Sequence, residues 1–268
     1  MKKQLKKVIS MLFPKGNFKE KVKLFYYSVN TPKQTSYALI YEKKKTVCKT
    51  TFQDLSLITN EALYFVAPDF NYYQHFYQVK SKDIIIDAGA NCGHLSILFS
   101  KLTGENGIVY AFEPDTFNVA RINNNVQLNK GLPKNIKIEN LLLWNENRLV
   151  DFYEAGTVGS SAVWIPDNDK CVKKQAIRID DWVLNNDIKK LDFVKMDIEG
   201  AEIEALEGCM KTIENLSPNF AIASYHIVNG APTYIKVEAF FKKMKYPYKT
   251  VRFRKNEIIT FAGASIKN

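Results

Sequence analysis

The sequence predicts a doubly wound α/β sheet, mostly parallel, that ends in a C-terminal antiparallel hairpin and follows an N-terminal α+β extension. Three observations predict this fold. From residue 83 onward, short and nearly continuous apolar runs alternate with helical stretches, which is typical of parallel βαβ units buried on both faces. A glycine turn follows the first of these runs, and two strand-like runs near the C-terminus flank three polar residues. We expect residues 1–80 to form the extension and residues 81–268 the main domain.

The composition is that of a globular protein with a basic N-terminal segment. The chain has 268 residues, 46% of them hydrophobic, which suffices for a large core and excludes disorder as its main state. The first 50 residues hold 13 lysines against only Glu20 and Glu42, and the rest of the chain is close to neutral. Such a basic segment is compatible with nucleic acid, anionic lipid or an acidic substrate, and equally with a plain solvated surface.

The spacing of the cysteines and the length of the apolar runs indicate in which cellular compartment the protein should reside. Cys48, Cys92, Cys171 and Cys209 are widely spaced, so neither a zinc site nor a disulfide framework is expected. No apolar run approaches the roughly 18–20 residues that span a membrane, and Val8–Phe13 is too short for a signal peptide. We therefore expect a cytoplasmic protein.

The N-terminal extension should contain two helices and three strands. Residues 2–13 predict a basic amphipathic helix, which either caps its own domain or docks on the anionic inner face of a membrane. Residues 22–29, 36–42 and 45–52 are strand-like. A second helix should open at Pro68, with Asp69 as its N-cap and with aromatic residues at helical spacing through Tyr77.

The main domain should consist of strands and helices that alternate regularly along the chain. We expect strands at 83–87, 108–112, 136–143, 191–196 and 220–224, helices near 93–103, 115–129, 200–215 and 233–245, and a hairpin of 248–253 with 257–261. Two further short runs, 149–154 and 175–179, interrupt this rhythm and are expected to pair at an edge of the sheet.

The strongest local signal is the glycine turn at the end of the first parallel strand. Asp87 ends that strand, and Gly89 and Gly93 let the backbone approach a ligand before the next helix begins. The following strand ends at Glu113, where folds of this kind bind a ribose diol through paired hydrogen bonds. A carboxylate at this place also disfavours a 2′-phosphate, because like charges repel.

Two adenosine cofactors fit such a site, and the residues favour one of them. A dinucleotide usually needs the pattern G-x-G-x-x-G for its pyrophosphate, and this sequence has Asn91 in place of the second glycine. S-adenosylmethionine carries no phosphate and presents an ammonium group, which an acidic residue in the turn suits. We therefore expect S-adenosylmethionine as cofactor and S-adenosylhomocysteine as its product.

These residues belong to a longer pattern, because the chain resembles the FkbM-type methyltransferases, a Rossmann-like family that uses S-adenosylmethionine. The resemblance covers residues 83–245. The matching segments, in family order, are Asp87–Gly93, Ala111–Pro114, Asn123–Asn129, Gly159–Ser161, Ile179–Asp181 and Lys195–Glu202. The resemblance implies methyl transfer, mostly to hydroxyl groups of sugars, glycolipids or other small molecules.

The resemblance also assigns roles to single residues. It implies that Asp87, Gly89, Asn91 and Gly93 hold the methionine part of the cofactor and that Glu113 binds the ribose. Leu142 and Leu143 should flank the adenine. The next residue, Trp144, departs from the small residue that is common there, and it fits either the adenine site or the core.

The acceptor chemistry is expected where the fourth and fifth strands end, at Asp197, Glu199 and His226. An alcohol needs a base to remove its proton, and a histidine with an ordinary pKa of ~6.5 can do so at neutral pH. We therefore predict His226 as general base, with Asp197 or Glu199 orienting it or the acceptor. The two carboxylates could also bind Mg²⁺, but their spacing alone is thin evidence, so we assign no metal ligand and the sequence leaves metal dependence open.

Two other functions are compatible with parts of the sequence. An RNA methyltransferase could use the basic arm to contact phosphates, but the arm contains only lysine, and Asp197–Gly200 replaces the Asn/Asp-Pro-Pro-aromatic loop of base methylation. A non-catalytic protein that retains the cofactor fold would not need acidic residues at two strand ends. We expect a small-molecule or glycan acceptor, and the sequence leaves the oligomeric state open.

Overall fold

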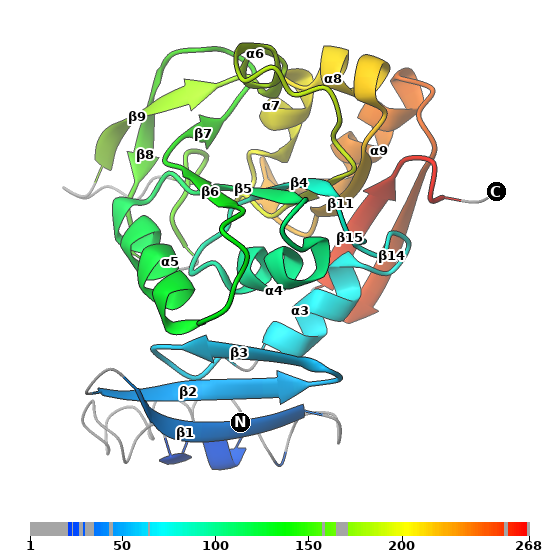
Figure 1. The fold of residues 1–268 in the computed structure, drawn as a ribbon. Coiled ribbons are helices and arrows are strands. Elements are labelled where there is room, and N and C mark those ends of the chain that lie inside the picture. Colours follow the sequence, from blue (N-terminus) through cyan, green and yellow to red (C-terminus); the bar gives the residue numbers. More distant parts are fainter. Residues whose placement is uncertain are drawn as a thin grey trace.

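A computed structural model describes residues 21–22, 24–26, 29, 35–42, 45–63, 65–156, 159–164, 171–254 and 257–266. Its centre is a seven-stranded sheet with the order β14-β15-β11-β10-β4-β5-β6 (Figure 1). The parallel strands are β4 (Ile84–Ala88), β5 (Ile108–Phe112), β6 (Ile136–Glu139), β10 (Phe193–Met196) and β11 (Asn219–Ala223). The hairpin β14 (Tyr248–Arg254) and β15 (Glu257–Ala262) joins antiparallel to β11. The predicted doubly wound sheet with a C-terminal hairpin is confirmed.

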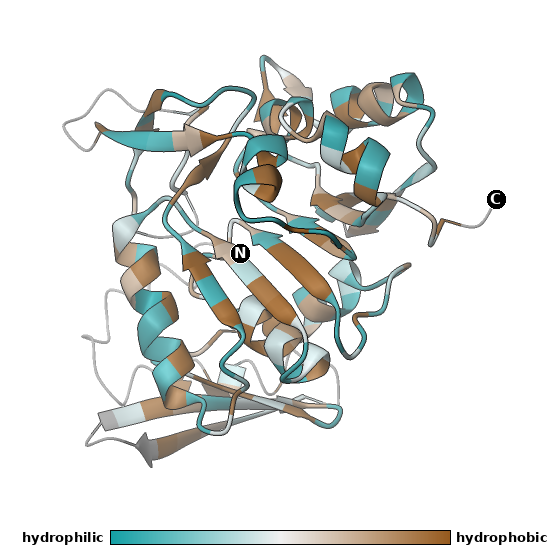
Figure 2. Ribbon diagram, turned by 45° about the horizontal axis from the view of Figure 1, so that its top comes forward, coloured by the Kyte–Doolittle hydropathy of each residue, from teal (hydrophilic) through white to brown (hydrophobic). Residues whose placement is uncertain are grey.

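Helices cover both faces of this sheet because its strands are apolar on both sides. Within β4, Ile85 belongs to one core and Ile86 to the other, as the alternation of a strand requires. The first core packs against α3 (Val66–Tyr73) and α4 (His94–Thr103), with α5 (Thr116–Leu128) beside them, as Figure 1 shows. The second core packs against α6 (Ile179–Asn185), α7 (Glu202–Glu207), α8 (Met210–Leu216) and α9 (Tyr234–Lys243). Figure 2 shows the central strands largely in brown, the colour of hydrophobic residues.

A second, smaller sheet stands beside the central one. The predicted strand 136–143 is divided into β6 and β7 (Leu142–Leu143), because Asn140 turns away to donate hydrogen bonds to the carbonyl oxygens of Glu113 and Pro114. The runs 149–154 and 175–179 pair as expected, as β8 (Leu149–Tyr153) and β9 (Cys171–Ile177), but in the separate sheet β7-β9-β8. The edge position predicted for them is therefore wrong, and Ile179 already begins α6.

The N-terminal extension contributes a three-stranded antiparallel sheet that packs under α4 and α5 (Figure 1). The predicted strands are β1 (Thr35–Glu42) and β2 (Lys45–Phe52), and β3 (Leu55–Thr59) joins them. The side chain of Asn129 fixes β3 to the body, since it accepts from the N–H of Ile58 and donates to the carbonyl oxygen of the same residue. Phe52 packs edge-on against Phe70, with ring centroids 5.4 Å apart. This sheet therefore shares the first core of the central sheet.

The predicted strand at 22–29 is wrong. Residues 21–22 and 24–26 are helical, and Leu24 is buried against Cys48 and Ala62 while Phe25 is exposed. A short apolar run cannot be assigned to strand or helix by periodicity alone.

The small β12 (Ile227–Val228) and β13 (Ala231–Pro232) complete the described strands.

The predicted N-cap of α3 is also wrong. The helix begins at Val66, three residues before Asp69, and the N–H of Asp69 already donates to the carbonyl oxygen of Phe65 at 2.9 Å. Pro68 is tolerated because the first turn of a helix needs no N–H donor there. Asp69 is thereby free to face a cavity, described below. The helix ends at Tyr73 and does not reach Phe76 or Tyr77.

The predicted basic helix at residues 2–13 lies outside the described residues. Within the described part of the chain, no helix combines the length and the apolar character that crossing a bilayer requires.

Candidate active site

A cavity of about 270 Å³ opens where the parallel strands end. Of the predicted site residues, the wall of this cavity contains Gly89, Asn91, Glu113, Leu142, Leu143, Asp197 and Glu199. Asp87, Gly93 and His226 are not on the wall, but Asp87 and His226 contact charged residues that are. The helix α3, from the segment predicted as a separate extension, supplies Asp69 and Tyr73 to the same cavity.

The glycine turn brings two strand ends into contact. Gly89 has a φ of +73°, and a Cβ at this residue would overlap the backbone carbonyl of Asp197, so only glycine lets β4 and β10 end this close together. The N–H groups of Gly89 and Ala90 both donate to the carbonyl oxygen of Phe112 at 3.0 Å. Gly93, with a φ of +77°, lies against the Ile122 side chain of α5 instead of the cavity. Its role in the turn is to let α4 begin close to α5.

Asp87 lies beneath the turn as half of a buried ion pair. The carboxylate is completely buried, with the Nζ of Lys195 at 3.0 Å from Oδ1 and the hydroxyl of Ser96 donating to Oδ2 at 2.5 Å. The same Nζ donates to the carbonyl oxygens of Ala88 and Gly89, at 3.2 and 2.8 Å. Asp87 therefore reaches the cavity only through Lys195, which the sequence analysis left without a role.

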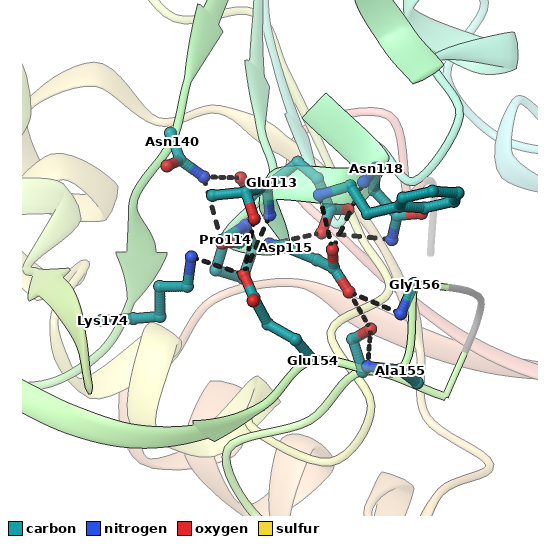
Figure 3. Close-up of polar contacts among 12 residues, drawn as sticks. Glu113, Pro114, Asp115, Asn118, Asn140, Glu154, Ala155, Gly156 and Lys174 are labelled. Atoms are coloured by element: carbon teal, nitrogen blue, oxygen red, sulfur yellow. Dashed lines mark hydrogen bonds and ion pairs between the residues drawn. The ribbon is translucent and has the colours of Figure 1, made fainter. Parts of the chain in front are cut away.

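Glu113 is buried on the cavity wall just beyond the end of β5, where its Oε2 accepts from the N–H of Asn91 at 2.7 Å. Its Oε1 accepts from the N–H of Asp115 at 3.0 Å (Figure 3). The amide of Asn118 lies 3.5 Å from Oε1. Burial raises the pKa of Glu113 to about 7, although these donors pull it down. Each carboxylate oxygen retains acceptor capacity toward the cavity.

Asp115 holds the loop that closes this side of the cavity. Its Oδ1 caps α5 by accepting from the N–H groups of Phe117 and Asn118. Its Oδ2 accepts from the N–H of Gly156 at 2.8 Å and from the hydroxyl of Ser160 at 2.6 Å (Figure 3). The Gly159–Ser161 segment is thereby fixed beside Glu113, and Ser160 lines the cavity.

The segment predicted to flank the adenine divides between cavity and core. Leu142 and Leu143 lie on the cavity wall. Trp144 is buried in the core of the small sheet, with Val150 and Phe152. Of the two positions that the sequence left open for Trp144, the structure shows the core.

The predicted catalytic residues form one cluster around an imidazole. The Nε2 of His226 lies 3.5 Å from Asp197 Oδ1 and 3.6 Å from Glu199 Oε2, and Nδ1 lies 3.0 Å from Oε1 of the fully buried Glu202. Tyr73 donates its hydroxyl to the other oxygen of Asp197 at 2.9 Å. The structure therefore brings together all three predicted residues and adds Glu202 and Tyr73.

The negative charge of this cluster moves the pKa of His226 away from the value expected from the sequence. Burial alone would lower the pKa of His226, but Glu202, then Asp197 and Glu199, raise it to about 9. Burial and the charge of Asp197 raise the pKa of Glu199 to about 7. The pKa of His226 therefore lies above the ordinary value that the sequence led us to expect, because three carboxylates surround the imidazole. The role of His226 as general base stays a prediction.

A second carboxylate–histidine pair, Asp69 with His94, also lines the cavity. The Nε2 of His94 is 3.5 Å from Asp69 Oδ2, and its Nδ1 is 3.7 Å from the sulfur of buried Cys92. The sequence analysis assigned Asp69 to a helix cap. The aromatic spacing of the segment could have shown that this acid shares a helix face with Tyr72 and Tyr73, and both of these line the cavity.

Comparison with known proteins agrees with this geometry. Residues 87–248 match the Methyltransferase FkbM domain. The 2-O-methyltransferase NoeI of Sinorhizobium fredii (strain NBRC 101917 / NGR234) is 24% identical over 151 residues, which cover 50% of this chain and 60% of that protein. The chain thus matches less than two thirds of this curated relative.

A solved structure of this family shows the same fold. A crystal structure of Methyltransferase FkbM from Methylobacillus flagellatus KT aligns with a TM-score of 0.53 at 18% identity, over 71% of this chain and 46% of that one. A SAM-dependent methyltransferase from Aquifex aeolicus aligns with a TM-score of 0.42 at 15% identity, over 70% and 85%. The domain match spans more than half of the sequence and includes both the glycine turn and Glu113. The chain therefore belongs to the FkbM family of S-adenosylmethionine-dependent methyltransferases.

Proposed function

We propose that this enzyme methylates a hydroxyl group of a sugar, a glycolipid or another small molecule. The observation that carries the proposal is the cluster of Asp197, Glu199 and His226, whose two carboxylates share one cavity with Glu113. An alcohol is a weak nucleophile until its proton is removed, and this cluster offers proton acceptors at the cavity wall. The relative NoeI is a 2-O-methyltransferase, which supports an oxygen acceptor.

The residues of the cavity fit the methyl donor. Glu113 would accept hydrogen bonds from the ribose hydroxyls, Leu142 and Leu143 would pack on the adenine, and the turn at Gly89 and Asn91 would hold the methionine part. When bound, S-adenosylmethionine supplies a methyl group that passes to the acceptor oxygen, while the electron pair of the broken C–S bond stays on sulfur. The chain's own task is to align the acceptor with that methyl group, to exclude water, and to take up the hydroxyl proton at the carboxylate–histidine cluster.

The acceptor class can be tested directly. Purified full-length protein would be incubated with donor labelled in its methyl group and with separate fractions of host glycans, glycolipids, small metabolites and RNA. We expect label in a carbohydrate, glycolipid or small-molecule fraction, in an ether linkage that resists mild base. Label confined to RNA, or to esters that base removes, would refute hydroxyl methylation of this acceptor class.

Replacing Glu113 with alanine should weaken S-adenosylmethionine binding by at least roughly tenfold, because two hydrogen bonds to a charged acceptor are lost. Isothermal titration calorimetry measures this. Glu105→Ala is the matched control, since Glu105 is an exposed acid in the loop that follows α4. Equal affinity of Glu113→Ala and Glu105→Ala for the cofactor would remove the ribose assignment.

Cofactor affinity should also depend on pH through Glu113. Its pKa in the free protein is about 7 because burial penalises the charged form. The ribose hydroxyls donate to the carboxylate form, so binding lowers this pKa and releases a proton. Affinity should therefore fall as the pH falls below 7, approaching about tenfold per pH unit. Calorimetry at several pH values in two buffers would measure both effects, and Glu113→Gln should give a flat profile. A flat profile for the unaltered protein would contradict the assignment.

A further inference from the structure

We propose that Asp197, Glu199 and His226 bind one divalent cation of the Mn²⁺ class, and that the acceptor hydroxyl binds to this cation. The second part rests on the proposed function, whereas the first is a property of the protein alone. The sequence left metal dependence open, because the spacing of Asp197 and Glu199 alone is thin evidence. The structure adds His226 from the next strand end, which makes a three-sided site.

The distances between the three ligand atoms fit one ion. One oxygen of each carboxylate and one imidazole nitrogen lie within 4.8 Å of one another. From His226 Nε2 the carboxylate oxygens are 3.5 and 3.6 Å away. Atoms about 2.1 Å from an octahedral cation lie roughly 3.0 Å apart when adjacent and about 4.2 Å apart when opposite. Shifts of a few tenths of an ångström, on the order of ordinary side-chain motion, would bring these atoms into place.

Two of the three atoms that would bind the ion make no hydrogen bond. Among the described residues, His226 Nε2 and Asp197 Oδ1 are buried nitrogen and oxygen atoms that make none. The His226 side chain is nine-tenths buried, with 10% of its surface exposed. Buried polar atoms are rarely left without a hydrogen bond, and those that are point to a missing ligand or ion. Both atoms point into the same space, toward each other and toward Glu199.

The other oxygen of Asp197 and the other nitrogen of His226 lie against further residues of the protein. Tyr73 fixes Asp197 by donating to Oδ2, so that Oδ1 faces His226. Glu202 Oε1 lies 3.0 Å from His226 Nδ1 and itself accepts from the N–H of Gly200 at 3.1 Å. A metal-binding histidine usually donates its other N–H to such a carboxylate, which fixes the ring and its tautomer. A small rotation of the ring would align this hydrogen bond.

The backbone holds Glu199 in a conformation that needs a reason. Glu199 has a φ of +54°, in the left-handed region that non-glycine residues seldom adopt because it is strained. The hydroxyl of Ser161 donates to the carbonyl oxygen of Glu199 at 3.0 Å and helps to keep it there. The conformation turns the Glu199 side chain back toward His226, although an extended chain would separate it from Asp197.

The ligand set indicates the kind of ion and its use. Two carboxylates suit Mg²⁺ and Mn²⁺, whereas the imidazole favours a transition metal, so Mn²⁺ satisfies both. Lys195, a buried cation two residues before Asp197, is occupied by Asp87 and the turn. Three protein ligands leave positions open for an acceptor oxygen. A bound cation would lower the pKa of such an oxygen, and the hydroxyl proton would pass to solvent water through the carboxylate oxygens of the cluster that do not bind the ion.

The site can be tested without turnover. Mn²⁺ chloride would be titrated into full-length protein, and the signal of free Mn²⁺ would be followed by electron paramagnetic resonance. We expect one bound ion per chain, and at least about tenfold weaker binding in both His226→Ala and Asp197→Asn, because a ligand is lost. Asp69→Asn is the matched control: it removes a cavity carboxylate that pairs with the other histidine, His94, and should leave Mn²⁺ affinity nearly unchanged. S-adenosylmethionine binding measured on the same samples shows that each variant is folded.

The other outcomes are distinguishable. If millimolar Mn²⁺ remains free with the unaltered protein, the cation site is refuted and the proposed methyl transfer stands. If the variants bind Mn²⁺ like the parent, or Asp69→Asn loses as much affinity as they do, the ion lies elsewhere and the assignment fails. If Mn²⁺ binds as expected but S-adenosylmethionine does not, the proposed function fails and the cation site survives.

Discussion

Replacing Lys195 with methionine is expected to lower the free energy of unfolding by about 3–5 kcal/mol, because it leaves the carboxylate of Asp87 buried without a compensating charge. Asp87 is fully buried and Lys195 is nearly so. Ser96 alone would remain as a partner of Asp87. For a chain of this size, such a loss lowers the midpoint of thermal unfolding by roughly 10 °C. Differential scanning calorimetry at neutral pH measures it.

The exposed ion pair at the opposite end of the same strand provides the control. Lys190 lies 2.9 Å from Asp192, with 56% of its side chain exposed, so Lys190→Met should cost at most about 1 kcal/mol. The double variant Asp87→Asn with Lys195→Met should be more stable than Lys195→Met alone, since it removes the uncompensated charge. Equal losses for Lys195→Met and Lys190→Met would show that the buried pair does not stabilise the turn.

The central sheet was predictable because its signals are local. Each parallel strand is a short apolar run, and each glycine or acid that ends a strand stands next to it in sequence. The glycine turn and Glu113 could therefore be placed before their distance was known. The errors lie where local signals conflict: Pro68 resembles the start of a helix, yet the helix begins at Val66, and residues 22–29 resemble a strand, yet most of those described are helical.

The partners of the site residues were harder to predict, because they depend on which strands are neighbours. Lys195 interrupts an apolar strand, and Asp87 interrupts another. The two residues are register partners across β10 and β4. Once the strand order is known, this pairing follows from burial alone, since neither charge can stay unpaired there. The order itself depends on contacts between residues over 100 positions apart, which no local pattern encodes.

The pKa of His226 could not be predicted for the same reason, because it depends on a partner that no local sequence pattern shows. The strand rhythm placed His226 correctly, at an end of the sheet beside Asp197 and Glu199. Its pKa depends on Glu202, which belongs to the first turn of α7 and reaches the imidazole from behind. The sequence shows only that Glu202 is an acid near a helix start, where acids are common for reasons unrelated to catalysis.

Replacing His226 with alanine should lower turnover by roughly 10²–10⁴-fold, the range expected when a group that assists proton transfer is lost. S-adenosylmethionine affinity should stay within about twofold of the parent, because His226 is behind the cavity wall and Glu113 is untouched. Steady-state kinetics with the acceptor found by the labelling experiment, together with calorimetry for the cofactor, separates the two effects. His75→Ala, an exposed histidine beyond the end of α3, is the matched control.

Glu202→Gln distinguishes a positioning role from a merely structural one. The amide keeps a hydrogen-bond acceptor for His226 Nδ1 but removes the buried charge, so turnover should fall by about 10–100-fold, less than in His226→Ala. The loss should appear in kcat and leave the KM for S-adenosylmethionine unchanged. If His226→Ala turns over like the parent, the cluster does not serve the acceptor, with or without a bound cation. If Glu202→Gln loses as much as His226→Ala, the buried charge of Glu202 is needed in full, and its hydrogen bond to the imidazole is not enough.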